Sequence, residues 1–159
     1  MIKHIMIPYD KSESANHAFE YAIDLAEKYN ASVSIVTCVL MQVPTEPYFG
    51  TAYIETTKLL KEDALKSISI LESRLKELEI QYKTDVLEVR SVPDSLITYE
   101  DTHNVDLIVM GSRGFGGFKN GELLPRFHLI SDLGEFDKYN FSKLFLRIVG
   151  DTNSSHVTF

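Results

Sequence analysis

A glycine-rich segment just after an apolar run carries the clearest chemical signal in the chain. Residues 105–110 read Val-Asp-Leu-Ile-Val-Met and are followed by Gly-Ser-Arg-Gly-Phe-Gly-Gly at 111–117. Glycine permits backbone angles and close approaches that other residues do not, so such a loop after a buried strand can present N–H groups to a phosphate. The pattern indicates a nucleotide site, and a tight structural connection is the alternative interpretation.

The carboxylate of Asp10 is a second candidate, because it directly follows the short apolar run 2–9. A carboxylate accepts hydrogen bonds from ribose hydroxyls, although an aspartate at this place can also cap a helix. Arg113 in the glycine-rich loop could pair with a phosphate or remain a solvated surface charge. A nucleotide site therefore requires a fold that brings Asp10 and the loop after Met110 together.

Strand and helix patterns alternate along the chain. Apolar runs predict strands at 2–9, 31–40, 86–89 and 105–110. Apolar residues at helical spacing predict helices from Ser12 or Ser14 to Asn30, along the stripe Leu60, Ala64, Ile68, Leu71, Leu75 and Leu78, and from Pro93 to about Asp101. Residues 42–52 are expected to form a loop. The alternation predicts an open, mostly parallel, Rossmann-like α/β sheet of about five strands with helices on both faces.

In such sheets, ligands bind at the carboxyl ends of the strands near the topological switch point. Asp10, Val39 and Gly111 are all expected at carboxyl ends of strands. The predicted fold therefore places the two candidate features at one edge of the sheet.

Two segments resemble the universal stress protein family. Residues 5–14, Ile-Met-Ile-Pro-Tyr-Asp-Lys-Ser-Glu-Ser, followed by an alanine-rich helix, resemble the opening of the family's domain, and residues 106–114 resemble its glycine loop. The match covers roughly residues 1–120 in order. The resemblance implies an adenine-nucleotide-type α/β fold, a homodimer and, in one branch of the family, bound ATP.

The resemblance also implies site residues for ATP or AMP, with Mg²⁺ only alongside ATP. Asp10 would meet the ribose or adenine, and Val39 would offer its backbone to adenine. Met110 and Gly111 would contact the ribose, and Arg113 and Gly114 would approach the phosphates. The contacts implied by the family motifs are Pro8, Tyr9, Asp10, Val39, Met110, Gly111, Ser112, Arg113 and Gly114.

The phosphate half of the motif departs from the family. The ATP-binding members of the family carry the motif Gly-x-x-Gly, followed by nine residues and then by Gly-Ser or Gly-Thr. Gly111 and Gly114 supply the first part, but Leu124 and Pro125 stand where Gly-Ser is expected. The first hypothesis is a module that binds ATP or AMP to regulate a stress response through its dimer or partner state. The alternative is a dimeric stress or interaction protein with a degenerate site and an unidentified protein partner.

We expect one domain over residues 1–149. Its recognisable part is 1–120, and residues 121–149 diverge from the family, with 143–149 as a replacement strand. The polar residues 150–159 are expected to form a flexible tail.

Composition narrows the function classes further. A net charge of −7 argues against nucleic-acid and anionic-membrane partners. The single cysteine, Cys38, is interpreted as a small buried residue in a protein of the reducing cytoplasm. The five histidines show no paired metal-ligand spacing. No nucleophile stands beside a readable base, so we expect a binding protein with at most slow ATP hydrolysis.

Overall fold

The computed structural model describes residues 2–41, 50–111 and 144–148. The strands are β1 (His4–Pro8), β2 (Ser32–Leu40), β3 (Tyr82–Val89), β4 (Leu107–Gly111) and β5 (Leu144–Ile148). The helices are α1 (Glu13–Tyr29), α2 (Gly50–Glu77) and α3 (Val92–His103). The strands form one sheet in the order β3-β2-β1-β4-β5, in which β1 to β4 run parallel and β5 runs antiparallel to β4. The predicted open, mostly parallel α/β sheet is confirmed.

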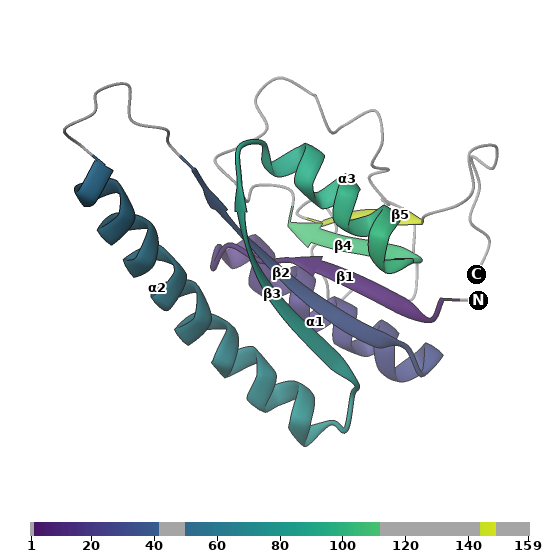
Figure 1. Ribbon diagram of the computed structural model, residues 1–159. Coiled ribbons are helices and arrows are strands. Elements are labelled where there is room, and N and C mark those ends of the chain that lie inside the picture. The colour runs from purple at the N-terminus through teal and green to yellow at the C-terminus, as the bar shows by residue number, and fades with distance from the viewer. Residues whose placement is uncertain (1, 42–49, 112–143, 149–159) are drawn as a thin grey trace.

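Both faces of the sheet are covered by helices. Successive strand residues point to opposite faces, so Ile5 and Ile7 share one apolar core with α1 and α2, whereas Met6 shares the other core with α3. Figure 1 shows α1 and α3 on opposite sides of the sheet. The strands that carry the candidate site are thus buried on both faces, which accounts for their continuous apolar runs.

The order of the strands creates a topological switch point beside β1. The chain moves from β1 outward to β2 and β3, and then returns through α3 to β4 on the other side of β1. The register pairs Met6 with Ile108, so the chain leaves both strands at the same edge of the sheet. The predicted convergence of Asp10 and Gly111 at this edge follows from the topology.

The helix ends have clear local causes. The Oγ of Ser12 accepts a hydrogen bond from Ala15 N at 3.1 Å, so Ser12 is the N-cap of α1 and Ser14 lies within the helix. Asn30 ends α1 in the left-handed conformation with φ 52°, and Asn104 ends α3 in the same way with φ 51°.

Two predicted element limits and one predicted core residue need correction. The helix α2 begins at Gly50, inside the expected loop at 42–52. Leu60 was placed in the buried stripe of α2 but is 47% exposed. The strand β3 starts at Tyr82 rather than at residue 86, because its polar first half pairs with β2 without an apolar signature.

The remaining stripe residues of α2 behave as predicted. Ala64, Ile68, Leu71 and Leu75 are buried, and Leu78 packs against the same core. The expected strand at 143–149 is present as β5. Of the divergent segment expected at 121–149, residues 121–143 and 149 lie outside the described residues, as does the expected tail at 150–159. Among the helices that are described, none combines the length and apolar character needed to cross a membrane.

Candidate functional site

The candidate site lies where β1, β2 and β4 end. Pro8 closes β1 and is buried, Tyr9 and Asp10 follow it, and Met110 and Gly111 close β4. Three of the predicted contacts, Ser112, Arg113 and Gly114, lie outside the described residues. The fold therefore brings five of the predicted contacts together at one edge of the sheet: Pro8, Tyr9, Asp10, Met110 and Gly111.

Asp10 shapes the turn that leads into α1. Its Oδ1 accepts a hydrogen bond from Ser12 N at 3.0 Å, and the intervening Lys11 has a left-handed φ of 67°. Lys11 also forms an ion pair with Asp63 of α2. Asp10 is partly exposed, and an ionised carboxylate has about four lone-pair sites. The residue therefore has a structural role in this turn and is partly accessible to solvent.

Tyr9 is buried beside the candidate site. Its hydroxyl donates to Asn16 Oδ1 at 2.8 Å, and its carbonyl accepts a hydrogen bond from Thr37 Oγ1 at 2.9 Å. Burial, and then the neighbouring Asp10 carboxylate, raise the pKa of the Tyr9 phenol. The phenol is thus engaged with α1, and the backbone N–H and C=O of Tyr9 are engaged with β2.

Gly111 meets the start of α1. A Cβ added to Gly111 would lie 2.6 Å from both the carbonyl carbon and the Oγ of Ser14. No real Cβ approaches another atom so closely, so the end of β4 packs against α1 in a manner that only glycine allows. This contact places the start of the glycine-rich loop beside the N-terminus of α1, which favours negative charge.

The hydrogen-bond ladder decides which residue of β2 faces the site. In a parallel sheet, successive residues direct their backbone groups to alternate neighbours. Val33 N bonds to Gln81 O and Met41 N bonds to Val89 O, so the odd-numbered residues of β2 bond to β3. Val39 belongs to this set, and its backbone groups point away from β1.

The even-numbered residues of β2 face β1. Ser32 N donates to Lys3 O, and Val36 O accepts a hydrogen bond from Tyr9 N just past the end of β1. Cys38 is the next residue of this set. Its backbone N–H and C=O therefore face the space above β1, one residue before the predicted Val39. The alternation of the hydrogen-bond ladder, and not the residue type, distinguishes Cys38 from Val39.

The Cys38 side chain is partly buried against the core that α3 covers. Burial raises the pKa of its thiol to about 12. The thiol is therefore held in the neutral form, in agreement with its interpretation as a small packing residue.

A groove of about 530 Å³ lies elsewhere, between β3 and α3. It is lined by residues such as Leu87, Arg90, Ser95 and Tyr99, and none of the predicted site residues contributes to its lining. Within the described part of the chain, no three His, Cys, Asp or Glu side chains gather in a metal-binding group. The candidate site therefore consists of backbone groups at the ends of the strands together with the Asp10 carboxylate.

Comparisons with known proteins agree with this fold. Residues 1–124 match the model of the universal stress protein family. The chain is 27% identical over 124 residues to universal stress protein MJ0531 of Methanocaldococcus jannaschii, which covers 75% of this chain and 69% of that protein. A universal stress protein family structure from Burkholderia pseudomallei superposes with a TM-score of 0.60 at 24% identity, covering 69% of this chain and 80% of that one. A family structure from Arabidopsis thaliana, with AMP bound, has a TM-score of 0.50 at 15% identity, covering 72% of this chain and 79% of that one.

Proposed function

The chain belongs to the universal stress protein family, and from this membership and the geometry of the site we propose that it binds an adenine nucleotide, AMP or ATP. The observation that carries the proposal is the convergence of Asp10 and Gly111 at the switch point between β1 and β4. Ligands of open α/β sheets bind at this place. The nucleotide would regulate a stress response by changing the dimer or partner state of the protein.

Each part of the nucleotide has a matching group. The Asp10 carboxylate would accept hydrogen bonds from the ribose hydroxyls. The adenine edge needs one donor and one acceptor, which the Cys38 backbone would supply at the end of β2. The α-phosphate would lie near Gly111 and the start of α1, where the helix dipole favours negative charge.

The bound AMP of the Arabidopsis thaliana structure supports the same ligand class. Because Leu124 and Pro125 replace the family's Gly-Ser, the β- and γ-phosphates would gain few contacts here. We therefore expect AMP and ATP to bind with similar affinity, within about tenfold, which corresponds to about 1.4 kcal/mol. Mg²⁺ would accompany ATP alone.

Calorimetric titration of AMP, and of ATP with Mg²⁺, into the purified full-length chain tests the proposal. Asp10→Ala should weaken AMP binding, because it removes the acceptor for the ribose hydroxyls. Asp101→Ala is the matched control, since Asp101 is an exposed carboxylate on α3 and should leave the affinity unchanged. Equal affinities for the native chain and Asp10→Ala would contradict the site.

The replacement of Gly-Ser favours a second function, that of a dimeric interaction protein with a degenerate site. A partner protein would then bind without nucleotide control. Absence of heat on titration with millimolar AMP and ATP would favour this alternative over nucleotide binding.

A further inference from the structure

The strand β3 forms one edge of the sheet, and the side of β3 that faces away from β2 is open. Among the described strands it pairs with β2 alone, and Figure 1 shows it between α2 and α3. Val33 N bonds to Gln81 O, and Met41 N bonds to Val89 O. The odd-numbered residues of β3 therefore direct their backbone groups to β2. The even-numbered residues direct theirs to the open side, and within the strand these are Tyr82, Thr84, Val86 and Glu88.

The outward backbone groups of these residues make no backbone hydrogen bond within the described part of the chain. Edge strands are commonly protected by charged side chains that keep other strands away. On β3 these charges are neutralised inside the chain, because Lys83 pairs with Asp85. Glu88 likewise pairs with Lys61 of α2. A row of free N–H and C=O groups at strand spacing is complementary to the backbone of an extended polypeptide.

The groove between β3 and α3 lies beside this open edge. Its lining comes from β3, the turn after β3 and α3, and no described residue of β2 contributes to it. Its volume of about 530 Å³ falls within the range of about 300–1,000 Å³ that is typical of ligand pockets. Leu87 is partly exposed in it and packs on the side of the sheet that α3 covers. A strand added to β3 would direct alternate side chains to this same side, and hence toward the groove.

The length of the groove fits a short segment. Its lining extends along α3 from Asp94 to His103, over which an α-helix rises about 14 Å. An extended chain rises about 3.3 Å per residue, so about four residues cover this distance and two of them face the groove. The groove therefore accommodates two apolar side chains of one added strand.

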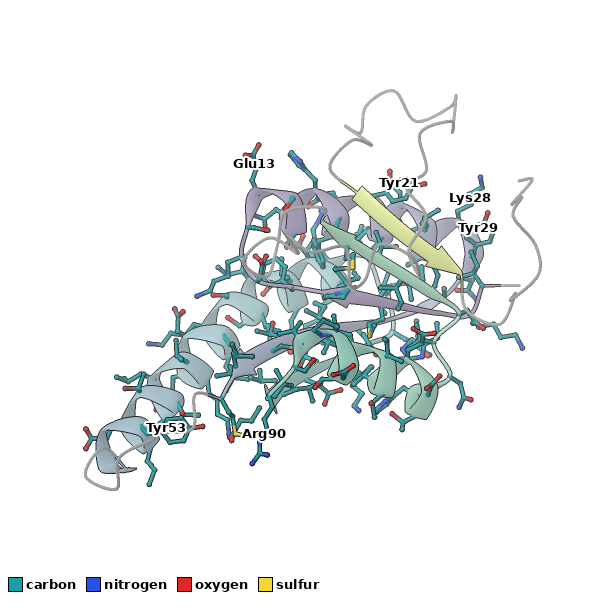
Figure 2. All side chains as sticks on the ribbon, turned by 90° about the horizontal axis from the view of Figure 1, so that it is seen from above. Glu13, Tyr21, Lys28, Tyr29, Tyr53 and Arg90 are labelled. Atoms are coloured by element: carbon teal, nitrogen blue, oxygen red, sulfur yellow. The ribbon has the colours of Figure 1, made fainter. Side chains whose placement is uncertain are left out.

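Arg90 lies just after the carboxyl end of β3 and lines the same groove. It is exposed, and Figure 2 shows its side chain extending away from the fold. It takes part in none of the four ion pairs of the described residues. Asp94, which also lines this end, stands in the first turn of α3, where the helix dipole favours its charge. A carboxylate on a bound segment would therefore pair with Arg90.

We propose that the open edge of β3 and the groove beside it bind an extended segment of a partner protein. The segment adds to the sheet as an antiparallel strand, the commoner pairing in proteins. Its backbone forms hydrogen bonds with Thr84, Val86 and Glu88. Its apolar side chains, at alternate positions, lie in the groove over Leu87, and an acidic side chain at its N-terminal end pairs with Arg90.

The surface is separate from the nucleotide site. The strand β2 lies between β3 and β1, and neither Asp10 nor Gly111 lines the groove. The proposal therefore does not depend on nucleotide binding.

A fluorescein-labelled heptapeptide, acetyl-Glu-Val-Thr-Val-Thr-Val-Thr-amide, is the probe for this surface. Its fluorescence anisotropy should rise and saturate as the purified full-length chain is added. Two further peptides carry N-methyl groups on alternate residues, one on the odd set and the other on the even set. Alternate N–H groups of a strand point to opposite edges. One methylated peptide should therefore bind at least about tenfold more weakly, because it loses its hydrogen bonds to β3, and the other should bind like the parent.

Val86→Pro tests the edge from the side of the protein. The Val86 N–H points outward, so proline removes a donor of the open edge and none of the hydrogen bonds between β2 and β3. The variant should bind the probe at least about tenfold more weakly. Arg90→Glu should also weaken binding, and a probe with lysine in place of its glutamate should restore it.

Thr98→Arg tests the groove without altering β3. Thr98 is exposed and lines the groove, so arginine there would occupy the space of the bound side chains and weaken binding. Asp101→Arg is the matched control, because Asp101 is exposed on the same helix but does not line the groove. Circular dichroism of each variant establishes that a loss of binding does not come from unfolding.

Three results would overturn the proposal. The first is a probe that does not bind at millimolar concentrations of the chain. The second is equal binding of both methylated peptides, or unchanged binding by Val86→Pro and Thr98→Arg, which would indicate unspecific apolar contact. The third is a mass that rises with concentration in sedimentation equilibrium of the native chain without peptide but not of Val86→Pro, which would make a second copy the occupant of the edge.

Discussion

Gly111 at the end of β4 lies directly against Ser14 in the first turn of α1, with no room for a side chain between them. The end of β4 is therefore in direct contact with the first turn of α1, and position 111 has no space for a larger residue.

Gly111→Ala should destabilise the fold, because the added Cβ would lie 2.6 Å from the Ser14 carbonyl carbon. Overpacking of this kind costs about 1–3 kcal/mol, measured as the free energy of unfolding in urea. Adding Ser14→Gly should recover only part of the loss, since the backbone contact remains. An alanine variant as stable as the native chain would mean that β4 and α1 are less closely packed.

The N-cap residues of α1 and α3 are Ser12 and Ser91. Replacing them with alanine should have different effects on stability. Ser12→Ala should cost about 1 kcal/mol of unfolding free energy, because the Ser12 Oγ accepts the Ala15 N–H. Ser91→Ala should cost only a few tenths, because the Ser91 side chain makes no cap hydrogen bond. Equal losses in a urea titration would contradict this assignment of the caps.

The stability of the fold at acidic pH should depend on Tyr99. Burial alone would raise the pKa of the Asp85 carboxyl, but hydrogen bonds from the Tyr99 hydroxyl at 2.6 Å and from Lys83 at 2.9 Å outweigh it and lower this pKa. A carboxyl with a lowered pKa stabilises the fold above its unfolded value of about 3.9, and this contribution is lost as the pH falls through the folded value.

Tyr99→Phe removes one of these donors and keeps the ring that stacks on His103. The variant should lose about 1 kcal/mol of unfolding free energy at neutral pH. It should also lose less stability than the native chain when the pH is lowered below about 4. Parallel stability curves for the two proteins between neutral and acidic pH would show that this hydrogen bond is not linked to the titration of Asp85.

The single thiol should be unreactive in the native protein. With the pKa of Cys38 raised to about 12, only about one molecule in ten thousand carries the reactive thiolate at pH 8. Reaction with an aromatic disulfide reagent should be at least about a hundredfold slower in the native chain than in urea. Comparable rates in both conditions would mean that the thiol is accessible and has an ordinary pKa.

Much of the architecture is readable from the sequence, because buried parallel strands leave apolar runs and amphipathic α1 leaves a periodic stripe. Two of the predictions that needed correction concern Leu60 and the start of β3. Leu60 fits the apolar stripe of α2 but is 47% exposed, whereas Ala64, one turn later, is buried. The first half of β3 is a partly exposed edge strand, so its polar residues show no apolar run.

The strand ends that form the candidate site could be predicted from the sequence, but the residue of β2 that faces it could not. Asp10 and Gly111 could be placed because each directly follows an apolar run in the sequence. The choice between Val39 and Cys38 could not be made from residue types, since it depends on which neighbour each backbone group faces. The backbone hydrogen bonds from Tyr9 N to Val36 O and from Met41 N to Val89 O show which residues of β2 face β1 and which face β3.

The most direct test of nucleotide binding at this edge is a titration of the isotope-labelled full-length chain with AMP, followed by amide nitrogen–proton spectra. The account predicts that the amides of Ser12, Cys38 and Gly111 shift together and saturate with one dissociation constant. Amide shifts confined to the groove between β3 and α3, or no shifts at millimolar AMP, would contradict it.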